Sequence, residues 1–313
     1  MKLENLARAD LSIQQAREHP SPWMIVWIAL KSHKGALVGA GVFSFIVLAV
    51  LVGPLFYTVD PQLTDYAVRN QGISWQHPLG TDNIGRDMLA QVLSGGRIAL
   101  AVGFAAMLLS LFLGTVVGVI AGYYKRLDGP LMRLTDLFLA MPLLPLLLVI
   151  ILLFRDALRD IFGLEFGIFI LIVFVIGITS WMQTARIVRG ETLAIKEREF
   201  VLAATSVGTS GLHIISTHIL PNILSPIMVS ATLGVASAII TESALSFLGL
   251  GFPSDFPTWG RLLYDGAPWI GIDSTNWLVR VFAPGIAISL TVLSVNYIGD
   301  ALRDAIDPRV RNK

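Results

Sequence analysis

Cysteine is missing from this 313-residue chain, and charged residues make up only 14% of it. The lack of cysteine excludes disulfide bonds, thiol catalysis and thiolate metal sites. The scarcity of charge, with 54% hydrophobic residues and a mean hydropathy of +0.71, excludes an ordinary soluble domain. The composition therefore predicts a polytopic membrane protein.

Motifs for nucleotide and hydrolytic chemistry are also absent. No glycine is followed by lysine, so there is no Walker-type phosphate loop, and neither H-E-x-x-H nor G-x-S-x-G occurs. If ATP powers this protein, another polypeptide binds the ATP.

Six apolar runs are long enough to cross about 30 Å of hydrocarbon as helices. The first, Ala36–Tyr57, starts too late and is too long for a cleaved signal peptide, so we expect it to remain. Before it, Trp23–Leu30 is too short to span and predicts an interfacial helix. The other five runs are Ile98–Tyr123, Leu131–Phe154, Phe166–Trp181, Ile219–Leu250 and Leu278–Ile298.

Basic residues are distributed unevenly between the connecting segments. The segments on the side of both termini hold 16 Lys and Arg, and the opposite segments hold 7. The positive-inside rule therefore predicts that both termini are cytoplasmic. The expected organisation is an N-terminal tail (1–35), a first transmembrane helix (36–57), an outer loop (58–97), a core domain (98–302) with five further spans and a cytoplasmic loop at 184–218, and a cytoplasmic C-terminal tail (303–313).

Small residues and a carboxylate stand out within the spans. Gly114, Gly118 and Gly122, four residues apart, predict close approach of another helix, either within one subunit or at a subunit interface or pore. Glu242 lies deep in the fifth run, where a carboxylate must face protein, water or a partner. It is either a buried hydrogen-bonding group or a pathway or gate residue. Prolines that predict kinks or first turns are Pro142, Pro145, Pro221 and Pro226.

Two outer segments, His77–Arg97 and Gly251–Trp269, are rich in turn residues, charges and aromatics. We expect them to pack over the outer mouth or to contact an external partner. No metal site is expected, because their His and Asp residues match no recognised ligand spacing. The residues singled out are His77, Asp82, Arg86, Asp87 and Trp259.

The stretch Thr184–Pro221 carries apolar residues at mostly helical spacing among charges, which predicts short amphipathic helices between two spans. Gly208 interrupts the pattern, and Thr209 or Ser210 is a candidate cap for a second short helix. Such a helix pair between spans predicts a docking element.

Within it, FVLAATSVGTSGLHIISTHILPN resembles the cytoplasmic signature loop of bacterial ABC importer permeases: E-A-A, three residues, Gly, nine residues, then I-x-L-P. Leu202 replaces the Glu of that pattern and His218 its Ile, while Glu199 lies three residues earlier. The matching residues are Ala203, Ala204, Gly208, Leu220 and Pro221.

Four more stretches resemble hallmarks of the oligopeptide, dipeptide and nickel permease family, particularly its C-type subunit. They are HPLGTDNIGRDML, ESALSFLGLG, TWGRLLYDG and GDALRDAIDPR. The resemblance implies an all-α membrane protein with six transmembrane helices, the type I ABC importer permease fold and a cytoplasmic coupling helix. It implies residence in a bacterial inner membrane.

The resemblance also implies partners: a second homologous permease in a heterodimer, two cytoplasmic ATPases that bind ATP and Mg²⁺, and a periplasmic or extracellular solute-binding protein. It implies no cofactor in this chain, no nucleic acid and no enzymatic role. Peptides are the expected substrates, with nickel chelates, opines and glycosides as alternatives. An ATP-independent channel or carrier and a membrane-embedded enzyme using Glu242 are the rival classes. The implied ATPase-coupling residues are Glu199, Phe200, Ala203, Ala204, Gly208, Leu220 and Pro221.

Overall fold

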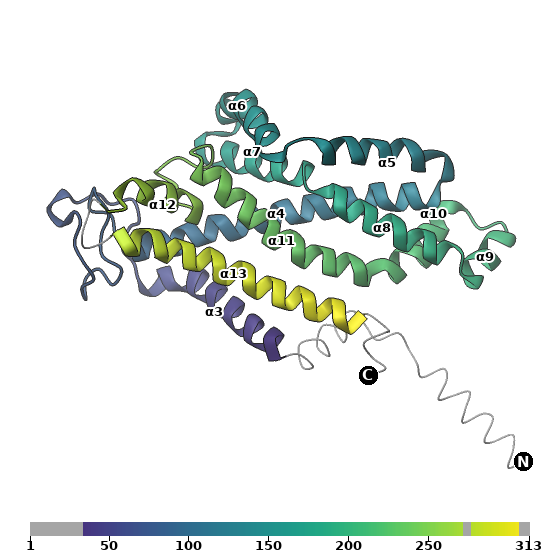
Figure 1. Cartoon of the computed structure of the whole chain (residues 1–313), viewed down its shortest axis with the longest axis horizontal. Coiled ribbons are helices and arrows are strands. Elements are labelled where there is room, and N and C mark those ends of the chain that lie inside the picture. Colours follow the sequence, from purple (N-terminus) through teal and green to yellow (C-terminus); the bar gives the residue numbers. More distant parts are fainter. Residues whose placement is uncertain (1–33, 272–276, 307–313) are drawn as a thin grey trace, which may run out of the picture.

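The computed structural model describes residues 34–271 and 277–306. Every long element of this part is a helix (Figure 1). The interfacial helix predicted at Trp23–Leu30 and the tail after residue 306 lie outside the described residues. The principal helices are α3 (Lys34–Phe56), α4 (Met88–Tyr123), α5 (Lys125–Ala140), α6 (Leu143–Phe162), α7 (Leu164–Ile178), α8 (Trp181–Lys196), α9 (Glu199–Ser206), α10 (Gly211–Ile214), α11 (Leu224–Phe247), α12 (Trp259–Gly266) and α13 (Trp277–Ile306).

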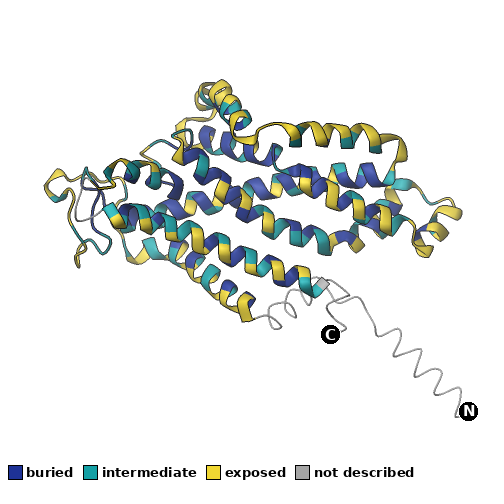
Figure 2. Cartoon of the chain, viewed as in Figure 1, coloured by how far each residue is buried: buried dark blue, intermediate teal, exposed yellow. Residues whose placement is uncertain are grey.

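Four helical stretches are long and apolar enough to cross a membrane unbroken, namely α3, α4, α13 and the run from α10 through α11. They lie along the long axis of the molecule (Figure 1). Helix α4 packs against α8 and α11, and α13 packs against α11 and α3. Buried residues line the inner faces of this bundle, whereas α5 and α6 are largely exposed (Figure 2).

The third predicted run is broken at Pro142, one of the prolines at which a kink or first turn was predicted, and the fourth predicted run ends at a second bend. Helices α5 and α6 meet at a 90° bend, and α7 and α8 meet at a 42° bend. Met141 is extended and Pro142 occupies the N-cap of α6, because the residue before proline is disfavoured in the helical region. Helix α7 has only 15 residues, so at 1.5 Å per residue it reaches about 22 Å.

The second span begins ten residues earlier than its apolar run, at Met88. The Asp87 carboxylate accepts a hydrogen bond from the Ala90 amide at 2.8 Å and so caps the first turn of α4. The fifth span is entered through a π-helical turn, Ile215–Ile219, and a 3₁₀ turn, Leu220–Ile223.

The three spaced glycines of α4 face α8 of the same chain. A Cβ at Gly114 would lie 2.6 Å from the Thr184 side chain, one at Gly118 would lie 2.6 Å from a backbone oxygen, and one at Gly122 would again lie 2.6 Å from a side chain. Real Cβ atoms do not approach so closely, so these positions admit only glycine at this helix separation. The structure thus places them in packing within one subunit.

Candidate functional site

The segments singled out in the sequence lie at opposite ends of the bundle. Helices α9 and α10 form one end, and the loop before α4 lies with α12 at the other (Figure 1). Between these ends, the two bent helix pairs flank α4 and α11. Three regions therefore concern function: the α9–α10 end, the interior of the bundle and the α12 end.

Helix α9 has a face anchored in the chain and a face left exposed. Val201 is buried in a cluster with Val188 of α8 and Ile219. Phe200 and Leu202, on either side of Val201, are 45% and 54% exposed. An apolar helical surface of this kind, held from behind, is suited to lie in a groove of another protein.

Gly208 ends α9 with a left-handed backbone, at φ +83°. Its N–H bonds the carbonyl of Thr205 at 3.0 Å, and the N–H of Thr209 bonds the carbonyl of Ala204 at 3.1 Å. This pair of bonds is the Schellman motif, which glycine favours because it has no Cβ to clash at positive φ. Ser210 occupies the N-cap of α10, although its side chain makes no capping bond.

The remaining residues implied for coupling lie around the same element. Glu199 is exposed in the first turn of α9, where its negative charge favours the helix N-terminus. The Phe200 ring lies 6.0 Å from the His218 ring, centroid to centroid. Ala203 and Pro221 are exposed, and Leu220 packs against the Val201 cluster.

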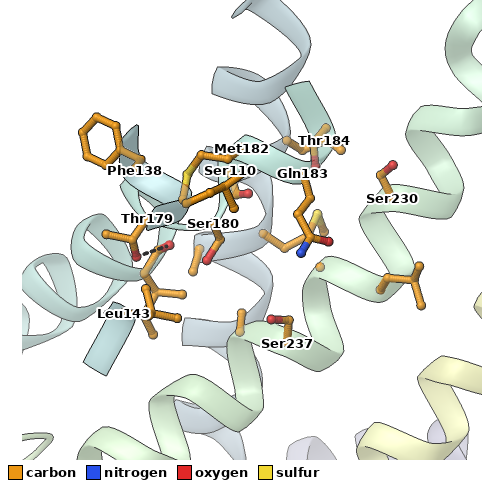
Figure 3. A pocket seen from close by; sticks show the side chains of 18 of the residues that line it. Ser110, Phe138, Leu143, Thr179, Ser180, Met182, Gln183, Thr184, Ser230 and Ser237 are labelled. Carbon is orange, nitrogen blue, oxygen red and sulfur yellow. Dashed lines mark hydrogen bonds between the residues drawn. The ribbon is translucent and has the colours of Figure 1, made fainter. Parts of the chain in front are cut away.

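An open cavity of about 250 Å³ lies between α4, α11 and the two bent helix pairs. The bend between α5 and α6 and the bend between α7 and α8 both border it, together with α4 and α11 (Figure 3). Interrupted helices are tolerated at membrane depth where they line a cavity. The cavity therefore lies where both helix pairs are interrupted.

None of the residues lining this cavity is ionisable. Figure 3 shows the Gln183 side chain extending from α8 toward α11. The Thr179 hydroxyl donates to the carbonyl of Val175 at 2.7 Å, and the Ser230 hydroxyl donates to the carbonyl of Pro226 at 3.0 Å. The polar lining residues are Ser110, Thr179, Ser180, Gln183, Thr184, Ser230 and Ser237.

Sequence reasoning did not single out any of these polar residues, because they come from three helices and a helix break. The available signal was the cluster Thr179, Ser180, Gln183 and Thr184, which lies at the end of the fourth apolar run, Phe166–Trp181. Polar side chains beside a helix break are a feature of transport pathways.

Glu242 is fully buried in α11 and does not line the cavity. Its carboxylate accepts a hydrogen bond from the Ser246 hydroxyl at 2.7 Å, and the Ser243 hydroxyl lies 3.4 Å away. A Cβ at Gly260 would lie 2.5 Å from the backbone of Ser243. The structure therefore places Glu242 where α12 packs closely on α11, which favours the hydrogen-bonding alternative over a gate.

The outer residues are joined by contacts within the chain. The Asp82 carboxylate accepts a hydrogen bond from Nε of Arg86 at 2.7 Å. Asp87 lies 2.8 Å from His77 Nδ1, and its side chain is only 1% exposed. Trp259 is buried and donates to the carbonyl of Val92 at 2.9 Å. In the part of the chain that the structure describes, no three His, Asp or Glu side chains gather as metal ligands would.

The fold is similar to a solved one. The structure of the MetNI methionine ABC transporter in inward-facing conformations has a chain that covers 70% of this chain, and 98% of its own length, at a TM-score of 0.53 and 18% sequence identity. At that identity the likeness concerns the fold alone. The protein accordingly has an all-helical type I ABC importer permease fold.

Sequence comparisons specify the family. Residues 114–312 match the model of the binding-protein-dependent transport system inner membrane component, and residues 21–72 match the N-terminal TM domain of oligopeptide transport permease C. The chain therefore belongs to the family of binding-protein-dependent transport system inner membrane components, which makes it a multi-pass membrane permease subunit.

Several relatives match over nearly their whole length. The dipeptide transport system permease protein DppC of Alkalihalophilus pseudofirmus is 38% identical over 93% of this chain and 91% of its own. The oligopeptide transport system permease protein OppC of Bacillus subtilis is 36% identical over 93% and 91%. OppC of Haemophilus influenzae is 36% identical over 97% and 94%.

Proposed function

We propose that this chain is a permease subunit of an ATP-driven importer of dipeptides or oligopeptides. The observation that carries the proposal is identity of 36–38% to dipeptide and oligopeptide permeases over more than nine-tenths of the chain. The subunit works by alternating access beside a second, homologous permease. Two ATPases supply the energy, and an external solute-binding protein delivers the peptide.

The exposed face of α9 is the surface that contacts the ATPase. Phe200, Leu202 and Ala203 supply an apolar patch, and Glu199 supplies a charge at its edge. Because Val201 ties α9 to the buried cluster that includes Ile219 and Ile223, a displacement of α9 is transmitted to the start of α11. Closure of the ATPases then moves the spans.

The α9 end of the bundle faces the cytoplasm in this proposal. The 16 Lys and Arg assigned to that side, against 7 on the other, support this orientation. The α12 end then faces the periplasm or the outside of the cell, where the binding protein docks.

The cavity forms this chain's half of the peptide pathway. Its hydroxyl and amide groups can exchange hydrogen bonds with peptide N–H and C=O groups. Because no ionisable residue lines it, it attracts neither cationic nor anionic side chains selectively. Such a lining suits an importer that accepts peptides with many different side chains.

Uptake of labelled dipeptide into proteoliposomes tests the proposal. The complete set of two permeases, two ATPases and the binding protein should accumulate peptide only with ATP inside the vesicle. Mass spectrometry of the ligand that co-purifies with the binding protein should identify peptides. Transport by this chain alone without ATP, or a nickel chelate, opine or glycoside as the bound ligand, would overturn it.

A further inference from the structure

In the outer loop, the side chain of Trp75 is fully exposed. Trp75 is 103% exposed relative to its reference state, and Ile73, two residues earlier, is 70% exposed. Tryptophan is a large, mostly apolar side chain with one polar N–H, so full exposure to water is unfavourable. Something outside this chain is therefore expected to cover it.

The turn that carries Trp75 is tied to the end of a membrane helix. Tyr57 follows directly after α3, and its hydroxyl oxygen lies 3.2 Å from the main-chain carbonyl of Gln76. That hydroxyl also donates to the Asp87 carboxylate at 2.7 Å. Trp75 is adjacent to Gln76 in the chain, so it lies close to the level at which α3 ends.

The turn itself is closed by hydrogen bonds. The Ser74 amide donates to the carbonyl of His77 at 2.9 Å, and the His77 amide donates to the Ser74 hydroxyl at 3.0 Å. The His77 ring lies 2.8 Å from the buried Asp87 carboxylate, which also caps α4. The exposure of Trp75 is thus a fixed feature of a turn braced against two membrane helices.

The last turn of α3 indicates what covers Trp75. Leu55 and Phe56 are 73% and 86% exposed, and at the end of an apolar 23-residue helix such side chains face lipid. The Tyr57–Gln76 contact makes the Trp75 turn continuous with this lipid-facing surface. Tryptophan concentrates at the membrane–water interface because its ring suits the headgroup level.

We propose that Trp75 is an interfacial anchor, inserted at the headgroup level of the bilayer at the α12 end of the bundle, with Ile73 beside it. The Tyr57–Asp87–His77 contacts act as positioning groups that hold the turn against the end of α3. The anchor fixes the depth of the outer loop relative to the membrane. It does not depend on which solute is transported.

The cysteine-free chain permits a direct test. In the Trp75→Cys variant, a nitroxide label is attached at position 75 of the assembled transporter in lipid nanodiscs. The label's collision rate is then measured with oxygen, which partitions into lipid, and with a nickel complex that stays in water. Phe56→Cys serves as the lipid-facing reference. Gln62→Cys, beside the polar outer cavity that Arg86, Asp255 and Asp265 line, serves as the aqueous reference.

The expected oxygen-to-nickel collision ratio at position 75 lies between the two references and several-fold above that at position 62. A ratio equal to that at position 62 would overturn the proposal. So would exclusion of both reagents, which would mean that a partner permease covers the site. Immobilisation of the label only after addition of the binding protein would assign Trp75 to that protein instead.

A second measurement leaves the turn unlabelled. The difference in tryptophan emission between the wild-type transporter and Trp75→Phe isolates the emission of Trp75. We expect that difference to be blue-shifted and to be quenched by lipids brominated near the headgroup. A red-shifted, unquenched difference would contradict membrane insertion.

Discussion

Gly208 shows how much a single backbone conformation contributes to the proposed coupling element. A Cβ at this position would meet no atom within 4 Å, so the cost of replacing it comes from φ alone, at +83°. For a residue other than glycine this conformation costs roughly 1–2 kcal/mol. A β-branched residue is expected to have the largest conformational cost, because such residues rarely adopt positive φ.

Gly208→Val is therefore expected to displace the end of α9 and to lower peptide-dependent ATP hydrolysis in proteoliposomes about five- to thirtyfold, with membrane insertion intact. Gly208→Asn should retain most activity, because asparagine tolerates the left-handed region.

Gly190→Ala provides the matched control for Gly208→Val. It lies within α8, its Cβ would likewise meet nothing within 4 Å, and its φ is not positive. Alanine in a helix interior is favoured over glycine by about 1 kcal/mol, so this variant should keep full activity. Wild-type peptide uptake by Gly208→Val would exclude the role assigned to the Schellman turn.

At the scale of the elements, Arg97 of α4 compensates for a break in the hydrogen bonding of α3. Pro54 has no N–H, so the carbonyl of Val50, four residues earlier, lacks its helical donor. The Arg97 Nε donates to that carbonyl at 3.0 Å, and an Nη donates to the carbonyl of Leu51 at 2.9 Å. The two helices are thereby joined at a proline.

Arg97→Ala is expected to lower the stability of the detergent-solubilised chain by about 1–3 kcal/mol, because it leaves a carbonyl without a donor in an apolar setting. In Pro54→Ala the helical N–H returns, so the further change Arg97→Ala should cost less. Thermal unfolding of the wild type, the two single variants and the double variant gives a double-mutant cycle, which measures the coupling between Arg97 and Pro54. Equal costs of Arg97→Ala with and without Pro54 would contradict the compensation.

The apolar runs predicted the unbroken elements well and the broken ones poorly. The all-α membrane fold and the permease family, which the sequence motifs indicated, are confirmed. Pro142 marked the break between α5 and α6, but an average over an apolar run gives neither the 90° angle of that break nor the bend by which α7 continues into α8 at Thr179–Ser180. The roles of Gly208 and the other coupling residues stay predictions, since they depend on a surface that another protein would cover.

At the scale of the whole molecule, the cavity is the feature that the sequence patterns do not reveal. Both bent helix pairs border it, and residues far apart in sequence, such as Ser110, Gln183 and Ser237, line it together. No spacing rule connects these residues, because α4, α8 and α11 bring them together only through tertiary packing. The apolar runs do show no repeated pattern of ionisable residues, and the lining of the cavity has no ionisable side chain either.

A charge introduced into this neutral cavity should make uptake depend on the charge of the peptide. Two unit charges about 7 Å apart, at an effective dielectric constant near 20, interact by about 2 kcal/mol, which is roughly thirtyfold in an equilibrium. Gln183→Glu repels an aspartate-containing dipeptide and attracts a lysine-containing one by about that energy each, so it is expected to reduce uptake of the first relative to the second by up to roughly a thousandfold. Gln183→Asn, which is shorter but neutral, should change both rates equally. If Gln183→Glu also changed both equally, the cavity would not be on the path of the peptide, because a carboxylate beside the path must distinguish the two charges.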